Sequence, residues 1–283
     1  MPVPLRALAL LAAMGFSAVP SWSTALGEPP PARIVSLAPS LTEILYGMDL
    51  GGRVVGVTTF CDRPAEARSK PKVGGVSNPS LEAIAALKPD LVVMTKDGNP
   101  KEVADRLTGL GLKIYVFSAY RLADVPAAIR RMGAALGAVP AAERMAASIE
   151  EAMRAPRPRS AAGETPVRRK ALFVIWPAPL IVAGPGTVLD DAMAASGFAN
   201  IASDAKAHYP HFSLEAVIER NPDLIIIGGG HGMEEPAKKL LKRLDMLDAV
   251  KAGHVCHTGD ALYRPGPRMP EGLAELRRCG EMR

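Results

Sequence analysis

The chain has 283 residues, of which 48% are hydrophobic, and it carries a formal net charge of +5 with a pI of about 9.2. This length and apolar content favour one large domain or two of modest size and exclude wholesale disorder. Lys and Arg are spread along the chain rather than gathered in one segment. The excess charge is therefore interpreted as a solvated basic surface, and we expect no nucleic-acid partner.

The N-terminus has the pattern of a secretory signal peptide. A positive charge at Arg6 precedes an apolar run over residues 7–19, and small residues at Ser23 and Ala25 fit cleavage after Ala25. The run is too short to span a bilayer comfortably. We therefore expect residues 1–25 to be removed and the mature protein to be soluble and exported.

The first predicted elements alternate between strand and helix. Residues 33–37 (RIVSL) are typical of a short buried strand. Ser40, with Glu43 three residues later, has the spacing of a capping box at the start of a helix that runs to about Gly47. An apolar run at 53–57 predicts the next strand. This order indicates a parallel sheet.

Two segments far apart in the chain are nearly the same. Residues 80–94 read SLEAIAALKPDLVVM and residues 213–227 read SLEAVIERNPDLIII, with seven of the fifteen positions identical. In each, a serine is suited to cap a helix, a proline ends that helix, and a continuous apolar run predicts a strand covered on both faces. Each copy thus predicts a helix that leads into a parallel strand.

Each copy also follows a strand of its own, at 33–37 and at 170–175, so the sequence predicts two similar α/β lobes. Residues 122–155 are Ala-rich and helical in pattern, with an interruption at 138–140. We expect the second of these helices, 141–155, to be a single long rigid helix that joins the lobes. The predicted organisation is a signal peptide (1–25), a first lobe (32–140), the linking helix (141–155), a linker (156–168) and a second lobe (169–283).

Several motifs resemble those of a known family, the periplasmic substrate-binding proteins of ABC importers. The class whose lobes are joined by a helical backbone carries cobalamin, haem and ferric siderophores. The resemblance covers essentially the whole mature chain and implies a periplasmic monomer without a cofactor, which delivers its ligand to a permease dimer in the inner membrane. The motifs are IVSLAPSLTE at 34–43, VVGV at 54–57, VGG at 73–75, the two Leu-Glu copies and RPGPR at 264–268.

Within this class the chain is most similar to the cobalamin-binding subfamily. The similarity lies in Asp62-Arg-Pro64, Gly98-Asn99, Tyr209-Pro210 and the loop of Asp260, Arg264 and Pro267-Arg268. Three positions depart from the subfamily's pattern. Val76 and Thr95 stand where tryptophans are expected, and Ser196 replaces the cysteine that pairs with the one at Cys279.

The resemblance also gives a role to the repeated Leu-Glu. In these importers one glutamate on each lobe docks into arginine pockets on the two permease subunits, and Glu82 and Glu215 match those positions. Each is expected in the first turn of its helix, where the helix dipole favours a carboxylate. A preference for acidic residues at helix starts, or descent from a duplicated lobe, would also explain the repeat.

We expect the ligand to bind between the lobes, where the loops that follow the strands meet. A corrinoid needs flat aromatic walls and hydrogen-bonding partners for its amides, and Arg264 could meet a phosphate or an amide. Phe60 and Trp176 could instead be core residues. The predicted ligand-binding residues are Ser40, Phe60, Asp62, Asn78, Asn99, Trp176, Tyr209, Asp260, Tyr263, Arg264 and Arg268.

Parts of the sequence are also compatible with other ligands and activities. Tyr209 or His208 could be an axial ligand of haem, and arginines with aromatics could bind a ferric siderophore. His208-x-x-His211 and His254-x-x-His257 could bind a metal ion, but all five histidines lie in the second predicted lobe and we expect no metal site. No nucleotide fingerprint, Gly-x-Ser-x-Gly motif or catalytic triad is visible, so we expect no enzyme.

The cysteines allow more than one redox state. Cys61, Cys256 and Cys279 are an odd number, so at least one thiol is left over. Export permits a disulfide, and Cys256 and Cys279 are the nearer pair. All three could equally remain unpaired.

Overall fold

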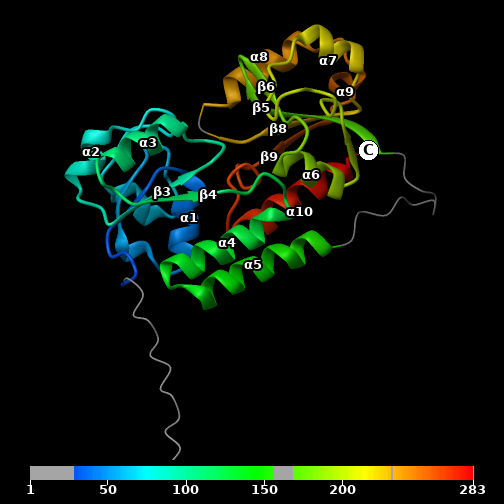
Figure 1. Ribbon diagram of the computed structural model, residues 1–283. Helices are drawn as coiled ribbons and strands as arrows, with labels where there is room; N and C mark the ends of the chain where they lie inside the picture. Colours follow the sequence, from blue (N-terminus) through cyan, green and yellow to red (C-terminus); the bar gives the residue numbers. More distant parts are fainter. Residues whose placement is uncertain (1–28, 156–167, 231, 283) are drawn as a thin grey trace, which may run out of the picture.

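The computed structural model describes residues 29–155, 168–230 and 232–282. The expected signal peptide and nearly all of the expected linker lie outside the described residues. The described chain forms two α/β lobes with three helices running beneath them (Figure 1). No helix in these residues is both long enough and apolar enough to cross a membrane.

The first lobe is built on a four-stranded parallel sheet in the order β2-β1-β3-β4. Its central strand β1 is fully buried, as predicted for residues 33–37. The elements of this lobe are β1 (Ile34–Ser36), α1 (Pro39–Gly47), η1 (Gly51–Arg53), β2 (Val54–Val57), η2 (Ala65–Ser69), α2 (Leu81–Ala86), β3 (Leu91–Thr95), α3 (Lys101–Gly109) and β4 (Ile114–Phe117).

The second lobe has a five-stranded sheet in which β6-β5-β8-β9 are neighbours and β7 also pairs with β5. All these pairings are parallel except that of β6, which returns beside β5 as an antiparallel strand. The elements are β5 (Arg169–Pro177), β6 (Leu180–Val182), α6 (Val188–Ala195), β7 (Phe198–Asn200), α7 (Leu214–Arg220), β8 (Leu224–Gly228), α8 (Glu234–Arg243), α9 (Asp248–Lys251), β9 (Val255–Thr258) and α10 (Met269–Gly280).

The repeated segment forms the same structure in both lobes. Ser80 and Ser213 each accept a hydrogen bond from a backbone N–H three residues on, at 3.1 Å. At the other end, Lys88 and Asn221 both adopt the left-handed conformation that ends the helix (φ 46° and 40°). The following Pro-Asp has a structural role as well, because each aspartate accepts a backbone N–H at the start of the lobe's first strand.

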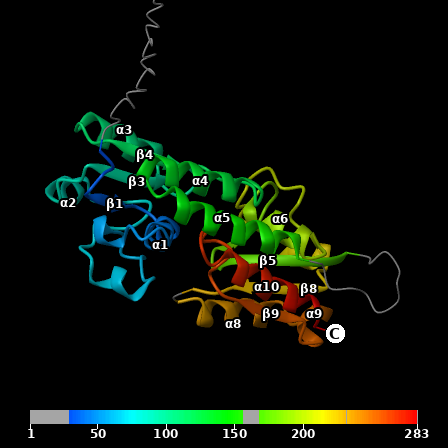
Figure 2. The same cartoon turned by 90° about the horizontal axis from the view of Figure 1, so that it is seen from below.

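The lobes are joined by a pair of helices, α4 (Asp124–Leu136) and α5 (Val139–Arg154), which pack side by side beneath them (Figure 2). The expected linking helix is α5, which begins two residues early because Pro140 is admissible in the first turn of a helix. Helix α10 lies along α5. Buried residues of both sheets and of α4, α5 and α10 form one continuous hydrophobic core, so the lobes are not separate packing units.

The predicted capping box at the start of α1 is wrong. Helix α1 begins at Pro39, its N-cap is Ala38, and no side chain caps it. Proline fits the first turn because its fixed φ suits a helix and its missing N–H needs no partner there. Ser40 therefore lies inside the helix, and Glu43 is turned inward with only 4% of its surface exposed. The role of Glu43 is described with the site.

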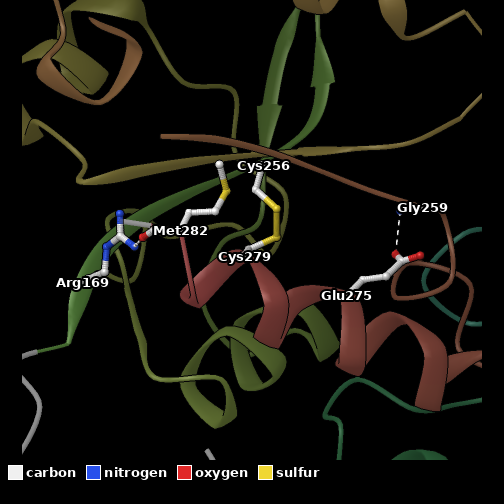
Figure 3. Close-up of a disulfide and its surroundings, with 6 residues drawn as sticks. All are labelled: Arg169, Cys256, Gly259, Glu275, Cys279 and Met282. Carbon is white, nitrogen blue, oxygen red and sulfur yellow. Dashed lines mark hydrogen bonds between the residues drawn. A yellow bond between two sulfur atoms is a disulfide. The ribbon is translucent and has the colours of Figure 1, made fainter. Parts of the chain in front are cut away.

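Helix α10 is anchored to the rest of the second lobe at two places along its length and at a third just beyond its end (Figure 3). Cys279 forms a disulfide with Cys256 of β9, and Glu275 accepts a hydrogen bond from the backbone N–H of Gly259 at 2.7 Å. Beyond the helix, Arg169 of β5 donates to the carbonyl of Met282 at 2.6 Å. In the subfamily, the partner of Cys279 would stand at position 196. Here Cys279 pairs instead with Cys256 on the edge strand β9. Cys61 is a buried free thiol.

Replacing Cys256 and Cys279 together by serine is expected to lower the free energy of unfolding by about 3 kcal/mol, because the disulfide closes a loop of 23 residues and so restricts the unfolded chain. Denaturant unfolding with and without a reductant measures this. The reductant should move the wild-type midpoint toward that of the double variant and leave the variant unchanged. Coincident wild-type curves would contradict the expectation.

Candidate functional site

A cavity of about 780 Å³ lies between the two lobes. Its first wall comes from the ends of β3 and β4 and from the segments that follow β1, β2, β3 and β4. Its second wall comes from the ends of β5 and β8, from the loop before α7 and from the loop before α10. The carboxyl ends of parallel strands meet at one edge of each sheet, which is why these distant segments come together. The lining residues are Ala38, Pro39, Ser40, Thr59, Phe60, Asp62, Val76, Thr95, Asp97, Gly98, Phe117, Ala119, Ile175, Trp176, Tyr209, Gly230, Met233, Tyr263, Arg264 and Pro265.

The aromatic side chains expected in the cleft do face it. Phe60 is 59% exposed, Tyr209 42% and Trp176 38%, values that exclude the alternative reading of Phe60 and Trp176 as core residues. The Trp176 indole donates to the carbonyl of Ala178 at 2.8 Å, which fixes one edge of its ring. Seven predicted residues line the cavity: Ser40, Phe60, Asp62, Trp176, Tyr209, Tyr263 and Arg264.

Four predicted residues do not line the cavity. Asn78 is exposed in a turn. Asn99 is buried, where its amide donates to the carbonyls of Leu37 and Val76 at 3.0 and 2.8 Å. Its carbonyl oxygen accepts the backbone N–H of Thr95 at 2.7 Å. Asn99 therefore holds together three segments that shape the cleft, and its role is structural.

The other two, Asp260 and Arg268, lie behind the cavity in an interlobe ion network with Glu43, Asp62 and Arg264. Arg268 donates to both carboxylate oxygens of Glu43 at 2.7 and 2.9 Å, and to Asp260 at 2.8 Å. Arg264 lies 2.6 Å from Asp62, 3.0 Å from Asp260 and 3.4 Å from Glu43. Because Glu43 and Asp62 belong to the first lobe and the others to the second, the network bridges the lobes.

The network is electrostatically tight because its side chains are largely withdrawn from water, with between 4% and 23% of each exposed. The hydrogen bonds to Glu43 raise the pKa of Arg268. Burial of Asp62 opposes its ionisation, but the hydrogen bond and charge of Arg264 outweigh burial and hold the pKa of this carboxyl below its ordinary value. Arg264, expected to meet the ligand, is thus already bound by three carboxylates.

Asp97 lines the cavity but is not among the predicted ligand-binding residues. It follows β3 directly, so the rule that places loops after strands at the site could have found it. Burial between the lobes raises its pKa. Burial also raises the pKa of Tyr209 and of Tyr263 to about 12, helped by nearby carboxylates, so both phenols are protonated donors at neutral pH. Met233, at the start of α8, also lines the cavity, and no pattern in the sequence indicated this.

The histidines do not form a metal site in the part of the chain that the structure describes, where no three His, Cys, Asp or Glu side chains gather around a common point. His208 stacks on Tyr120 across the lobes, with ring centroids 5.8 Å apart, and its Nδ1 lies 2.9 Å from the carbonyl of Pro185. It is not among the lining residues of the cavity.

Glu82 and Glu215 are not lining residues of the cavity and lie in the first turns of α2 and α7. These two helices belong to different lobes (Figure 1). Both are exposed. Hydrogen bonds at the start of α7, from the backbone and from Ser213, lower the pKa of Glu215. Within the repeated segment the serine and the aspartate have structural roles, whereas both glutamate side chains are exposed, with Glu215 hydrogen-bonded at the start of its own helix.

Comparison with known proteins identifies the class of fold and of site. A family model described as periplasmic binding protein matches residues 34–262. The chain is 32% identical over 203 residues to the vitamin B12-binding protein of Pectobacterium atrosepticum, covering 70% of this chain and 72% of the relative.

Solved structures agree with that result. The vitamin B12-binding protein BtuF of Vibrio cholerae superposes with a TM-score of 0.77 at 25% identity, covering 89% of this chain and 97% of that one. The haem-binding protein RhuT of Roseiflexus sp. RS-1 in its apo form gives a TM-score of 0.74 at 27% identity, covering 87% and 98%.

Proposed function

Because the chain belongs to the periplasmic binding protein family, we propose that it captures a cobalamin in the cleft between its lobes and delivers it to an ABC permease. The observation that carries the choice of ligand is the cleft itself, whose exposed aromatics Phe60, Trp176 and Tyr209 come from both lobes. Such rings suit the apolar rim of a corrin, while the phenols of Tyr209 and Tyr263 can donate to its amides. The similarity to vitamin B12-binding proteins supports the same ligand.

Delivery requires a membrane partner and export. We assign docking on the permease dimer to Glu82 and Glu215, which lie one on each lobe, as two subunits require. Export follows from the signal-peptide pattern of residues 1–25. The working form is a monomer that binds one ligand per chain and converts nothing.

Haem is the second candidate, because one specific group could bind its iron. The Tyr209 phenol lies in the cleft, and tyrosine is a known axial ligand of haem iron. The structural similarity to a haem-binding protein is in keeping with this. Against it, iron would have to displace a proton from a phenol whose pKa is raised to about 12.

Titration of two Tyr209 variants separates the two ligands. For cobalamin, Tyr209→Ala is expected to weaken cyanocobalamin binding about tenfold or more through loss of one aromatic wall, whereas Tyr209→Phe keeps the ring and most of the affinity. For haem, Tyr209→Phe would remove the iron ligand and its visible absorption signature. Calorimetry with cyanocobalamin and with hemin measures both.

The wild-type titration decides the function itself. A one-to-one response to cyanocobalamin in the sub-micromolar range is the expected result. No detectable binding of cyanocobalamin together with tight binding of hemin would favour haem as the ligand. Unchanged cyanocobalamin affinity in Tyr209→Ala would place the ligand elsewhere on the protein.

A further inference from the structure

We propose that Asp62 and Asp97 make the cleft select against ligands that present a carboxylate to its inner wall, so that it accepts an amide-fringed tetrapyrrole and rejects its acid counterpart. This proposal rests on the proposed function, since it specifies which chemical form of the ligand the same cleft accepts. It starts from the charges that face the cavity and from what each of them contacts.

The cleft offers a carboxylate no unengaged cation among its described lining residues. Arg264 is the one Lys or Arg among them, and its guanidinium is held by Asp62, Asp260 and Glu43. Lys96, next to the lining residue Asp97, lies outside the lining with its ammonium 5.4 Å from the centroid of the Tyr120 ring. A ligand acid would therefore meet at Arg264 a guanidinium whose positive charge three carboxylates already offset.

The ion network behind the cavity also carries a net charge. It contains three carboxylates and two guanidiniums, which leaves one negative charge. Its members are largely withdrawn from water, so salt screens their field less than it screens charges on the surface. Asp97 adds a second carboxyl to the cavity wall, on the loop after β3 and apart from the network.

A neutral group and an anionic group of a ligand therefore differ in their interaction energy with this wall. An amide can donate to Asp62 or Asp97 and accept from a tyrosine, so its hydrogen bonds are satisfied. A carboxylate at the same place is repelled by both aspartates and loses its water without gaining a cation. A unit charge within about 7 Å of another in such surroundings changes affinity by about tenfold or more.

The test compares cyanocobalamin with its monocarboxylic acids, in which hydrolysis has turned one propionamide into a carboxylate. The readout is the ratio of the two dissociation constants within each protein, so a general change in affinity cancels. We expect the acids to bind the wild type about tenfold more weakly than cyanocobalamin. Asp62→Asn and Asp97→Asn should each reduce that ratio toward one.

Two variants separate an effect at the cavity wall from indirect effects on the protein. Asp97→Asn touches no member of the ion network, so it remains informative if Asp62→Asn disturbs the contact between the lobes. Asp105→Asn removes one negative charge from the exposed face of α3 in the same lobe and should leave the ratio unchanged. Equal affinity of the wild type for both ligands, or an unchanged ratio in both cleft variants, would overturn the proposal.

Failure of the proposed function gives a different result. If the wild type binds hemin and not cyanocobalamin, the ligand assignment is wrong, and the same comparison is made between hemin and its dimethyl ester. Tighter binding of the ester than of hemin, with the difference reduced in Asp97→Asn, would uphold the selection against carboxylates. Tighter binding of hemin would refute it.

Discussion

Replacing Glu82 and Glu215 together by alanine is expected to abolish uptake of the ligand while its affinity for the purified protein stays unchanged. Both side chains are exposed in the first turns of equivalent helices, outside the cavity. The serine and the aspartate of the repeated segment have partners within their own lobes, so the fold accounts for them. The repeated glutamate is the part of the motif for which an external partner is the natural explanation.

The size of the effect follows from how docking carboxylates act. Removing one partner of a desolvated, hydrogen-bonded charge pair at an interface costs about 2–5 kcal/mol, so two such losses weaken docking on the permease by about a thousandfold or more. Uptake by cells that lack their own binding protein, together with calorimetric titration of the ligand, measures the two properties separately.

The matched control removes two other exposed glutamates, Glu102 of α3 and Glu219 of α7, one from each lobe. That pair should leave both uptake and affinity as in the wild type. Normal uptake by the Glu82→Ala and Glu215→Ala double variant would exclude the docking role. Reduced ligand affinity in the same variant would show that the residues act on the cleft.

Glu43→Gln is expected to lower the free energy of unfolding by about 3–5 kcal/mol, the largest stability loss that we predict for a single substitution. Glu43 is 4% exposed and receives two hydrogen bonds from Arg268, with Arg264 at 3.4 Å. The neutral amide keeps the shape of the side chain, but it replaces one of the two charged acceptors of Arg268 by an NH2 donor, so a largely buried guanidinium N–H loses its hydrogen bond. Denaturant unfolding at neutral pH measures the loss.

The control for Glu43→Gln disrupts a second ion network, which is more exposed to water. Arg130 joins Glu143 and Glu150 across α4 and α5, and its side chain is 34% exposed, so Arg130→Gln should change stability far less than Glu43→Gln. The pH dependence of the free energy of unfolding is a second measure of what the buried network contributes. Because the folded pKa of Asp62 is lowered, its contribution is present above the ordinary carboxyl pKa and is lost as the pH falls through the lowered value. Equal losses of stability in Glu43→Gln and Arg130→Gln would contradict a special role for the buried network.

Much of the architecture followed from local patterns in the chain. Short, continuously apolar runs at 91–94 and 224–227 predict strands covered on both faces, and the structure pairs each in parallel with the first strand of its own lobe. The repeated segment predicted its own helix cap and stop, because these depend on residues within a few positions of one another. The cleft aromatics were found by the rule that loops leave parallel sheets at one edge.

The sequence by itself thus determined the two lobes, their helical connection, the family and four aromatic residues of the cleft wall, Phe60, Trp176, Tyr209 and Tyr263. Only the tertiary structure decided how the charged groups and cysteines are paired. Glu43 has the spacing of a capping residue, yet it binds Arg268, which lies 225 positions away in the sequence. Arg264 was expected to meet the ligand, but Asp62, 202 positions away, holds it. A local pattern records hydrophobic periodicity and caps, whereas ion pairs and disulfides depend on which distant loops the packed core brings together.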